Sequence, residues 1–80
     1  MSNDIFQVME YGHILASDED VRLLVTWNGR ATYNLWSENG LGNYDNVDVA
    51  TYDPTPDSTP IEMQDALVYA SERLSEWAQG

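Results

Sequence analysis

The sequence contains no cysteine, and for so short a chain this absence constrains the fold more than any other feature. Without disulfides or thiolate metal ligands, 80 residues must be held together by hydrophobic packing alone. A chain of this size builds one core and buries roughly 60 to 65% of its unfolded surface. The hydrophobic content of 42% is sufficient for that core and too high for a disordered acidic segment. We therefore expect a single folded domain over residues 1–80.

Charge narrows the class of partner. Fourteen carboxylates face three arginines and no lysine, which gives a formal net charge of −11. A surface this negative repels phosphate groups and anionic lipids, so we expect no direct binding to nucleic acid and no membrane binding. A basic protein is the complementary partner. No apolar run approaches the ~18 residues that span a bilayer, and the N-terminus lacks the basic start of a signal peptide, so we expect a soluble, intracellular protein.

Hydrophobic alternation and turn signals predict an α+β fold with a four-stranded, mainly antiparallel β-meander. The expected strands span about residues 5–16, 21–26, 30–36 and 44–52. Gly12 in the first strand is a candidate β-bulge. Ser17–Asp20 is an acidic turn, and residues 37–43, which contain Asn39-Gly40 and Gly42-Asn43, form a turn-rich connection. Residues 53–58 form a proline-stiffened linker.

Asn28-Gly29 is the strongest hairpin signal in the chain. A two-residue loop there would pair Leu23 with Asn34 and mix polar with apolar side chains on one face. A three-residue loop over residues 27–29, with Gly29 left-handed, instead gathers apolar residues on one face. We expect this second register, which places Val21, Leu23 and Val25 opposite Leu35, Tyr33 and Ala31.

Thr59 to Glu62 predict the start of a C-terminal helix over about residues 60–79. Thr59 is a favourable N-cap, Pro60 suits the first helical position, and Glu62 completes a capping box worth about 1 kcal/mol. Seven apolar residues then fall on one stripe at helical spacing: Met63, Ala66, Leu67, Ala70, Leu74, Trp77 and Ala78. The opposite side forms an acidic ridge with one tyrosine: Glu62, Asp65, Tyr69, Glu72 and Glu76. The helix should therefore pack on one face of the sheet and expose the ridge.

No pattern points to catalysis or to a cofactor. His13, the only histidine, has no evident partner for general-base work and no converging metal ligands, so we expect an ordinary strand residue. Without lysine there can be no Gly-Lys phosphate loop. Asp45, Asp48 and Asp53 could form a calcium or magnesium site, but their spacing does not match an EF-hand loop. We expect a protein that is not an enzyme and that binds no cofactor or metal.

The acidic ridge is the candidate functional surface. Its acids recur about once per helical turn, or ~5 to 6 Å, which is comparable to neighbouring phosphates on nucleic acid. Such a ridge fits a groove lined by Lys and Arg, and its binding should weaken with salt. We also expect at least one of Trp27, Trp36 and Tyr52 to be exposed, because one helix cannot cover both faces of a sheet. The expected partner-binding residues are Asp57, Glu62, Asp65, Glu72, Glu76, Trp36 and Tyr69.

Two simpler interpretations of the acidity stand beside this one. A polar helix face is commonly just solvated and serves solubility alone. The absence of lysine, together with many Asp and Thr residues, also resembles proteins of salt-loving organisms, whose acidic surfaces are a general adaptation. Neither interpretation changes the expected fold, and a monomer is expected over a dimer.

The short, acidic, cysteine-free chain, with strands followed by one helix and no catalytic motif, resembles small phage and mobile-element proteins of the anti-CRISPR kind. It looks particularly like inhibitors of type I effector complexes. Members of that group commonly fold as small α+β domains and block the basic surface with which the Cascade complex holds DNA, sometimes as nucleic-acid mimics. The resemblance covers the whole length but rests on architecture and charge, so it transfers no residue roles.

The resemblance implies a stoichiometric inhibitor that acts in the cytoplasm of a host cell. Its partner would be a basic nucleic-acid-binding protein, such as a Cas subunit of Cascade, and its effect would be to block target DNA binding. The alternative is an acidic adaptor or structural accessory protein of a phage or halophile, with no inhibitory role.

Overall fold

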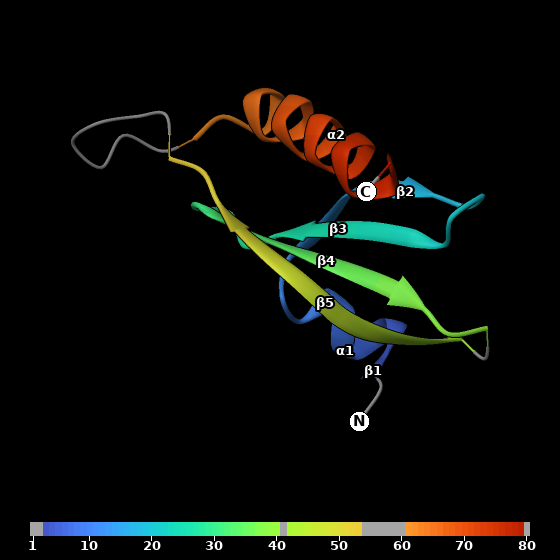
Figure 1. Ribbon diagram of the computed structural model, residues 1–80. Coiled ribbons are helices and arrows are strands. Elements are labelled where there is room, and N and C mark those ends of the chain that lie inside the picture. The colour runs from blue at the N-terminus through green and yellow to red at the C-terminus, as the bar shows by residue number, and fades with distance from the viewer. Residues whose placement is uncertain (1–2, 41, 54–60, 80) are drawn as a thin grey trace.

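The structure is a computed structural model that describes residues 3–40, 42–53 and 61–79. It confirms an α+β fold with an antiparallel sheet and a C-terminal helix, but the sheet has five strands rather than four. The elements follow in the order β1 (Asn3–Asp4), α1 (Ile5–Met9), β2 (His13–Asp18), β3 (Leu23–Trp27), β4 (Thr32–Glu38), β5 (Asn43–Thr51) and α2 (Met63–Gln79) (Figure 1).

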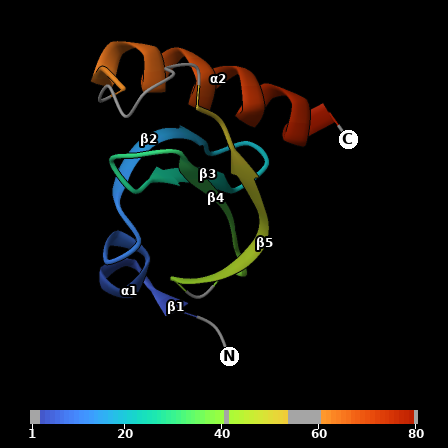
Figure 2. The same ribbon diagram turned by 90° about the vertical axis from the view of Figure 1, so that its left-hand side faces the viewer.

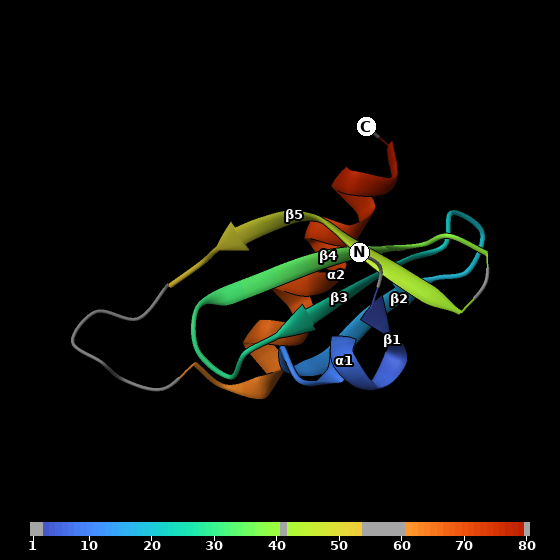
Figure 3. The same cartoon turned by 90° about the horizontal axis from the view of Figure 1, so that it is seen from below.

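The five strands form one curled sheet with the order β1-β5-β4-β3-β2. The N-terminal β1 pairs with β5 at one edge, while β2 forms the opposite edge beside β3. Since the chain runs from β1 to β2 through α1, this short helix lies between the two edges of the curled sheet (Figure 2). Helix α2 lies on the outer face, so the two helices cover opposite faces of the sheet (Figure 3).

The expectation of one strand over residues 5–16 is wrong, because the first part of that segment is helical. The Asp4 carboxylate accepts a hydrogen bond from the Gln7 amide (2.9 Å), and the Gln7 side chain accepts one from the Asp4 amide (2.9 Å). This capping box starts α1 and outweighs the apparent alternation of the segment. The strand begins only at His13, and its register shift lies between Ile14 and Ala16 rather than at Gly12.

The β3–β4 hairpin follows neither of the two expected registers. Val25 pairs with Leu35 and Trp27 pairs with Tyr33. The intervening loop has its own hydrogen bonds: the Asn28 carboxamide accepts from the amides of Arg30 (2.8 Å) and Thr32 (3.2 Å), and the Asn28 amide donates to the Thr32 carbonyl (3.1 Å). These bonds favour a wider loop than Asn28-Gly29 suggested. Leu23, Val25, Tyr33 and Leu35 still face the main core, because the pairing is shifted by an even number of positions. The expectation for Val21 is wrong, since this residue lies before β3 and is 42% exposed.

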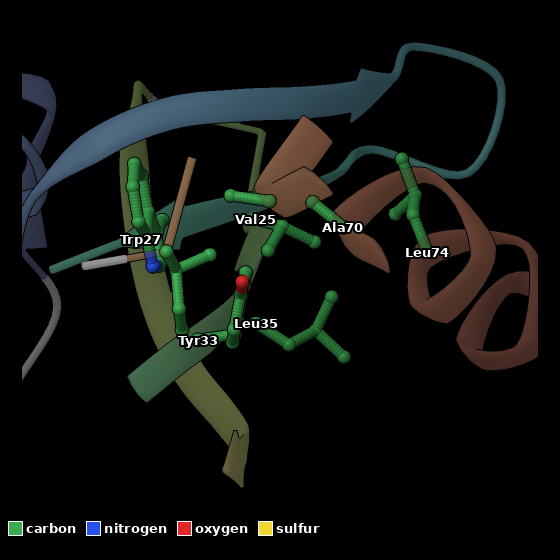
Figure 4. Close-up of a cluster of buried hydrophobic side chains, with 8 residues drawn as sticks. Val25, Trp27, Tyr33, Leu35, Ala70 and Leu74 are labelled. Atoms are coloured by element: carbon green, nitrogen blue, oxygen red, sulfur yellow. The ribbon is translucent and has the colours of Figure 1, made fainter. Parts of the chain in front are cut away.

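The main core lies between the outer face of the sheet and α2. Figure 4 shows side chains from β3 and β4 meeting Ala70 and Leu74 of the helix. The buried members of this core are Val25, Trp27, Tyr33, Leu35, Ile61, Ala66, Ala70 and Leu74. The Trp27 indole N–H donates to the Arg30 carbonyl (2.8 Å), so its polar edge is satisfied.

A second, smaller core lies under α1 on the inner face and consists of Val8, Leu24 and Trp36. The Trp36 indole N–H donates to the buried Thr26 hydroxyl (2.9 Å). The expected exposure of at least one of Trp27, Trp36 and Tyr52 is therefore wrong: Trp27 is 4% exposed, Trp36 is fully buried, and Tyr52 is half-buried. The expectation failed because α1 provides cover for the second face of the sheet.

Helix α2 begins at Met63, three residues after the expected start at Pro60. The Glu62 carbonyl accepts the first helical hydrogen bond from the Ala66 amide (3.0 Å), which places Glu62 at the cap. Thr59, Pro60 and most of the expected linker, residues 54–58, lie outside the described residues. The described helices include none that is both long and apolar enough to cross a membrane.

The buried stripe of α2 is narrower than the sequence suggested. Ala66, Ala70 and Leu74 are buried, whereas Met63 and Leu67 are 47% and 40% exposed. Half-buried Tyr69 and Trp77 pack against the main core. The stripe is therefore rotated toward the side of the helix that carries the acids.

Candidate protein-binding surface

Carboxylates are spread over the described residues rather than gathered in one lobe. They occur before and after α1, in the β2–β3 turn, along β5 and on α2. Total charge therefore does not single out a surface, and each group of acids must be judged by its surroundings.

The acidic ridge of α2 is interrupted. Asp65 and Glu72 are exposed and lie seven positions apart, or about 10.5 Å along the helix axis. Tyr69, between them, turns toward the sheet and packs on the core. Glu76 is ion-paired with Arg73 at 2.9 Å. The helix therefore does not carry the evenly spaced, phosphate-like series of charges expected from the sequence.

Instead, Asp65 and Glu72 flank a shallow hollow between α2 and the residue that follows β5. The hollow is lined by Tyr52, Asp65, Val68, Tyr69 and Glu72. Tyr52 is held at this place because its amide donates to the Ala31 carbonyl (2.9 Å). We call this feature the tyrosine hollow; it combines an aromatic wall with two carboxylates.

The aromatic wall is a layered cluster. The rings of Tyr52 and Tyr69 are parallel, with centroids 4.0 Å apart and an interplanar angle of 4°. The ring of buried Tyr33 meets Tyr69 at a centroid distance of 4.7 Å and an angle of 58°. These contacts fix the orientation of both surface tyrosines without help from a ligand.

Electrostatics at the tyrosine hollow favour a cation. Burial, together with the neighbouring Tyr69, Tyr52 and Asp65, raises the pKa of the Tyr33 hydroxyl to about 12. The negative charge that favours a cation in the hollow comes from the carboxylates of Asp65 and Glu72, which line it. Arg73 pairs with Glu76, and within the described residues neither Asp65 nor Glu72 has an arginine partner.

A second set of contacts holds the C-terminal half of α2 against β5. The Arg73 guanidinium lies 4.6 Å from the centroid of the Trp77 ring. The Trp77 indole N–H donates to the Asp48 carboxylate (2.8 Å), whose other oxygen accepts from the Val49 amide (2.8 Å). These interactions join α2 to β5 near the tyrosine hollow. They involve Asp48, one of the three aspartates that suggested a cation site in the sequence.

The structure brings together only part of the expected binding site. Asp65, Tyr69 and Glu72 line the tyrosine hollow. Trp36 does not belong to the site, because it is fully buried in the core on the opposite face of the sheet. Glu62 is exposed but does not line the hollow, Glu76 is neutralised by Arg73, and Asp57 lies outside the described residues.

Tyr52 and Val68 are the members of the hollow that the sequence did not assign to it. The sequence marks Tyr52 only as one of three aromatic residues of which at least one is expected to be exposed. No spacing rule connects Tyr52 with Tyr69, because the two residues belong to different elements and meet only when α2 folds onto the sheet. A valine at the position of Val68, on the polar side of the helix, was the available signal.

The described residues contain no group of three or more His, Asp or Glu side chains placed to hold a metal ion. His13 is an exposed residue of β2 that pairs with Trp27. Comparisons of the chain with protein-family models, with curated proteins and with solved structures give no match.

Proposed function

We propose that this protein acts by binding a basic protein through the side of α2 that carries Asp65 and Glu72, and that it does not act as an enzyme. The observation that carries the proposal is two carboxylates, without an arginine partner among the described residues, next to a fixed aromatic wall. Charged and aromatic groups in one place provide both electrostatic attraction and buried contact area.

The specific partner that we propose is the DNA-binding surface of a type I CRISPR surveillance complex, Cascade. Occupation of that surface by a stoichiometric acidic protein would block target DNA binding. The support for this target is the sign and size of the charge, −11 over 80 residues, which complements a surface built to hold phosphates. Because the acids of α2 are not evenly spaced, we propose competition for the basic surface rather than an imitation of the DNA backbone.

The direct test is a competition experiment. Purified Cascade is mixed with increasing amounts of the protein before target duplex is added, and DNA binding is followed by fluorescence anisotropy. We expect DNA binding to fall until the proteins reach equimolar amounts, and we expect the inhibition to weaken as salt is raised. Undiminished DNA binding at a large excess of the protein would remove this target.

A pair of charge-reversed variants separates the location of the charge from its total. The double variant Asp65→Lys and Glu72→Lys changes the proposed surface, whereas Glu10→Lys and Asp20→Lys makes the same change of net charge elsewhere. Both pairs of residues are exposed. We expect only the first variant to lose binding. Equal losses would mean that the protein binds through its net charge and not through α2.

A second candidate function is an acidic adaptor or structural accessory protein of a phage or halophile. The wide distribution of carboxylates over the described residues favours this candidate, because a general adaptation to salt has no need of a localised site. This candidate predicts that neither charge-reversed variant changes DNA binding by Cascade. It also predicts that the protein folds only at high salt.

A further inference from the structure

The residues that line the tyrosine hollow are those expected of a binding site for one planar cation. Tyr52 contributes ring surface and is backed by the parallel ring of Tyr69 at 4.0 Å. Val68 contributes an exposed apolar side chain, and Asp65 and Glu72 contribute negative charge on either side of Tyr69 in the helix. Aromatic faces attract cations through their quadrupole, and carboxylates bind them by charge-assisted hydrogen bonds. We propose that this hollow binds the guanidinium of an arginine side chain presented by the partner protein, an inference that rests on the proposed function.

The site is organised before any ligand arrives. Tyr69 is held between the parallel ring of Tyr52 and the tilted ring of Tyr33, and Tyr33 is fully buried. The contacts of Trp77 with Asp48 and Arg73 fix the following turns of the same helix. A wall that is already ordered loses little conformational entropy on binding, which favours affinity for a small group.

Charge and shape exclude other classes of ligand. Anions are disfavoured because Asp65 and Glu72 have no arginine partner among the described residues. A divalent metal ion needs several oxygen ligands within ~2.6 Å, and the described residues contain no group of three or more His, Asp or Glu side chains placed to hold one. Tyrosine rings supply no further metal ligands in the hollow.

Arginine suits the hollow better than lysine does. A guanidinium is planar, stacks on aromatic rings, and has five N–H donors that point in different directions, so it can reach carboxylates on two sides. An ammonium is a compact, strongly hydrated charge that cannot stack and contact two separated acids at once. The exposed Val68 side chain is available to cover the methylene stem of the same arginine.

The test uses short peptides and needs no CRISPR complex. The isotope-labelled protein is titrated with acetyl-Gly-Arg-Gly-amide and, separately, with acetyl-Gly-Lys-Gly-amide, while backbone amide and Val methyl resonances are followed by NMR. We expect the arginine peptide to shift resonances of Tyr52, Asp65, Val68, Tyr69 and Glu72, and to bind about threefold more tightly than the lysine peptide. Equal affinities, or shifts scattered over acids in every part of the chain, would overturn the proposal.

A matched pair of conservative variants provides the control. Glu72→Gln removes one charge from the hollow, and Glu10→Gln makes the identical change at an exposed position after α1. We expect Glu72→Gln to weaken the arginine peptide about threefold and Glu10→Gln to leave it unchanged. Tyr52→Leu should weaken the arginine peptide and abolish its advantage over lysine; since Tyr52 packs on the core, an unchanged amide spectrum elsewhere must show that this variant is folded.

The outcomes for the two proposals can be told apart. Selective binding of the arginine peptide without any effect on DNA binding by Cascade would retain the tyrosine hollow as an arginine-binding site and reject the proposed target. The opposite outcome is inhibition of Cascade that Glu72→Gln and Tyr52→Leu leave unchanged, together with equal binding of the two peptides. It would retain the proposed target and reject the tyrosine hollow as an arginine-binding site.

Discussion

All three tryptophan indole N–H groups have hydrogen-bond acceptors, whereas the buried hydroxyl of Tyr33 has none among the described residues. A buried polar group without a partner opposes folding by about 1 to 3 kcal/mol. Tyr33 nevertheless contributes its ring to the contact with Tyr69. The ring of this residue therefore stabilises the site, and its hydroxyl does not.

The substitution Tyr33→Phe should increase the free energy of unfolding by about 1 kcal/mol at neutral pH, because it keeps the ring and removes the unsatisfied hydroxyl. Urea denaturation followed by tryptophan fluorescence measures this change. Tyr69→Phe is the control, since Tyr69 has no unsatisfied buried hydroxyl. Destabilisation by Tyr33→Phe would show that the hydroxyl is bonded after all.

The raised pKa of Tyr33 makes the stability of the fold depend on pH in the alkaline range. Its pKa is raised from 10.0 to about 12 in the folded protein, so below pH 10 the group is neutral in both states and folding is unaffected. Between pH 10 and 12 only the unfolded chain releases the proton, so stability falls by on the order of 2 kcal/mol. Tyr33→Phe should remove this part of the alkaline loss, which urea denaturation at pH 9 and pH 11 can measure.

At the scale of elements, the passage from α1 to β2 depends on one glycine. Gly12 has a φ of 143°, and a Cβ atom at that position would lie 1.9 Å from the Trp27 carbonyl oxygen. The close approach lets the chain leave α1 and join the edge of β3 directly. The second core therefore depends on the absence of a side chain here as much as on its apolar residues.

Gly12→Ala should lower the free energy of unfolding by about 3 kcal/mol, because it combines an unfavourable φ with a clash against backbone that cannot move aside easily. Thermal unfolding measures the loss. Gly29→Ala is the matched control: Gly29 also has a positive φ, 85°, but a Cβ there meets nothing within 4 Å. Similar losses in the two variants would mean that the φ value alone, and not the contact with Trp27, makes Gly12 necessary.

The elements also show which sequence signals were sufficient. The helical spacing of Ala66, Ala70 and Leu74 predicted α2 correctly, because a 3.6-residue period that continues over several turns rarely occurs by chance. The five-residue α1 was missed because its apolar residues also fit a strand, and the decisive signal was the Asp4–Gln7 capping box. The hairpin register was missed because Asn28 makes side-chain bonds that no local propensity rule anticipates.

At the scale of the whole molecule, the dominant property is a net charge of −11. Like charges spread over a small protein repel one another, and salt reduces that repulsion by shortening the Debye length from ~30 Å at 0.01 M to ~3 Å at 1 M. The two candidate functions differ in how strongly folding depends on this screening.

We expect the protein to be folded in dilute buffer and to gain on the order of 1 kcal/mol of stability between 0.01 and 1 M NaCl. Thermal unfolding at several salt concentrations measures the gain, which should raise the melting temperature by about 4 to 8 °C per kcal/mol. The same series in glucose of equal osmolality controls for solute effects other than screening. An unfolded chain in dilute buffer would favour the halophile candidate over the inhibitor.

The fold class, the C-terminal helix and the negative charge follow from the sequence alone, since these properties depend on composition and on local periodicity. The sequence also placed Asp65, Tyr69 and Glu72 on one helix. Three features appear only in the folded protein: Tyr69 turns inward to stack on Tyr52, Arg73 neutralises Glu76, and α1 buries Trp36. These outcomes depend on contacts between residues far apart in the chain, and the free energy of such contacts is set by packing, which no local pattern encodes.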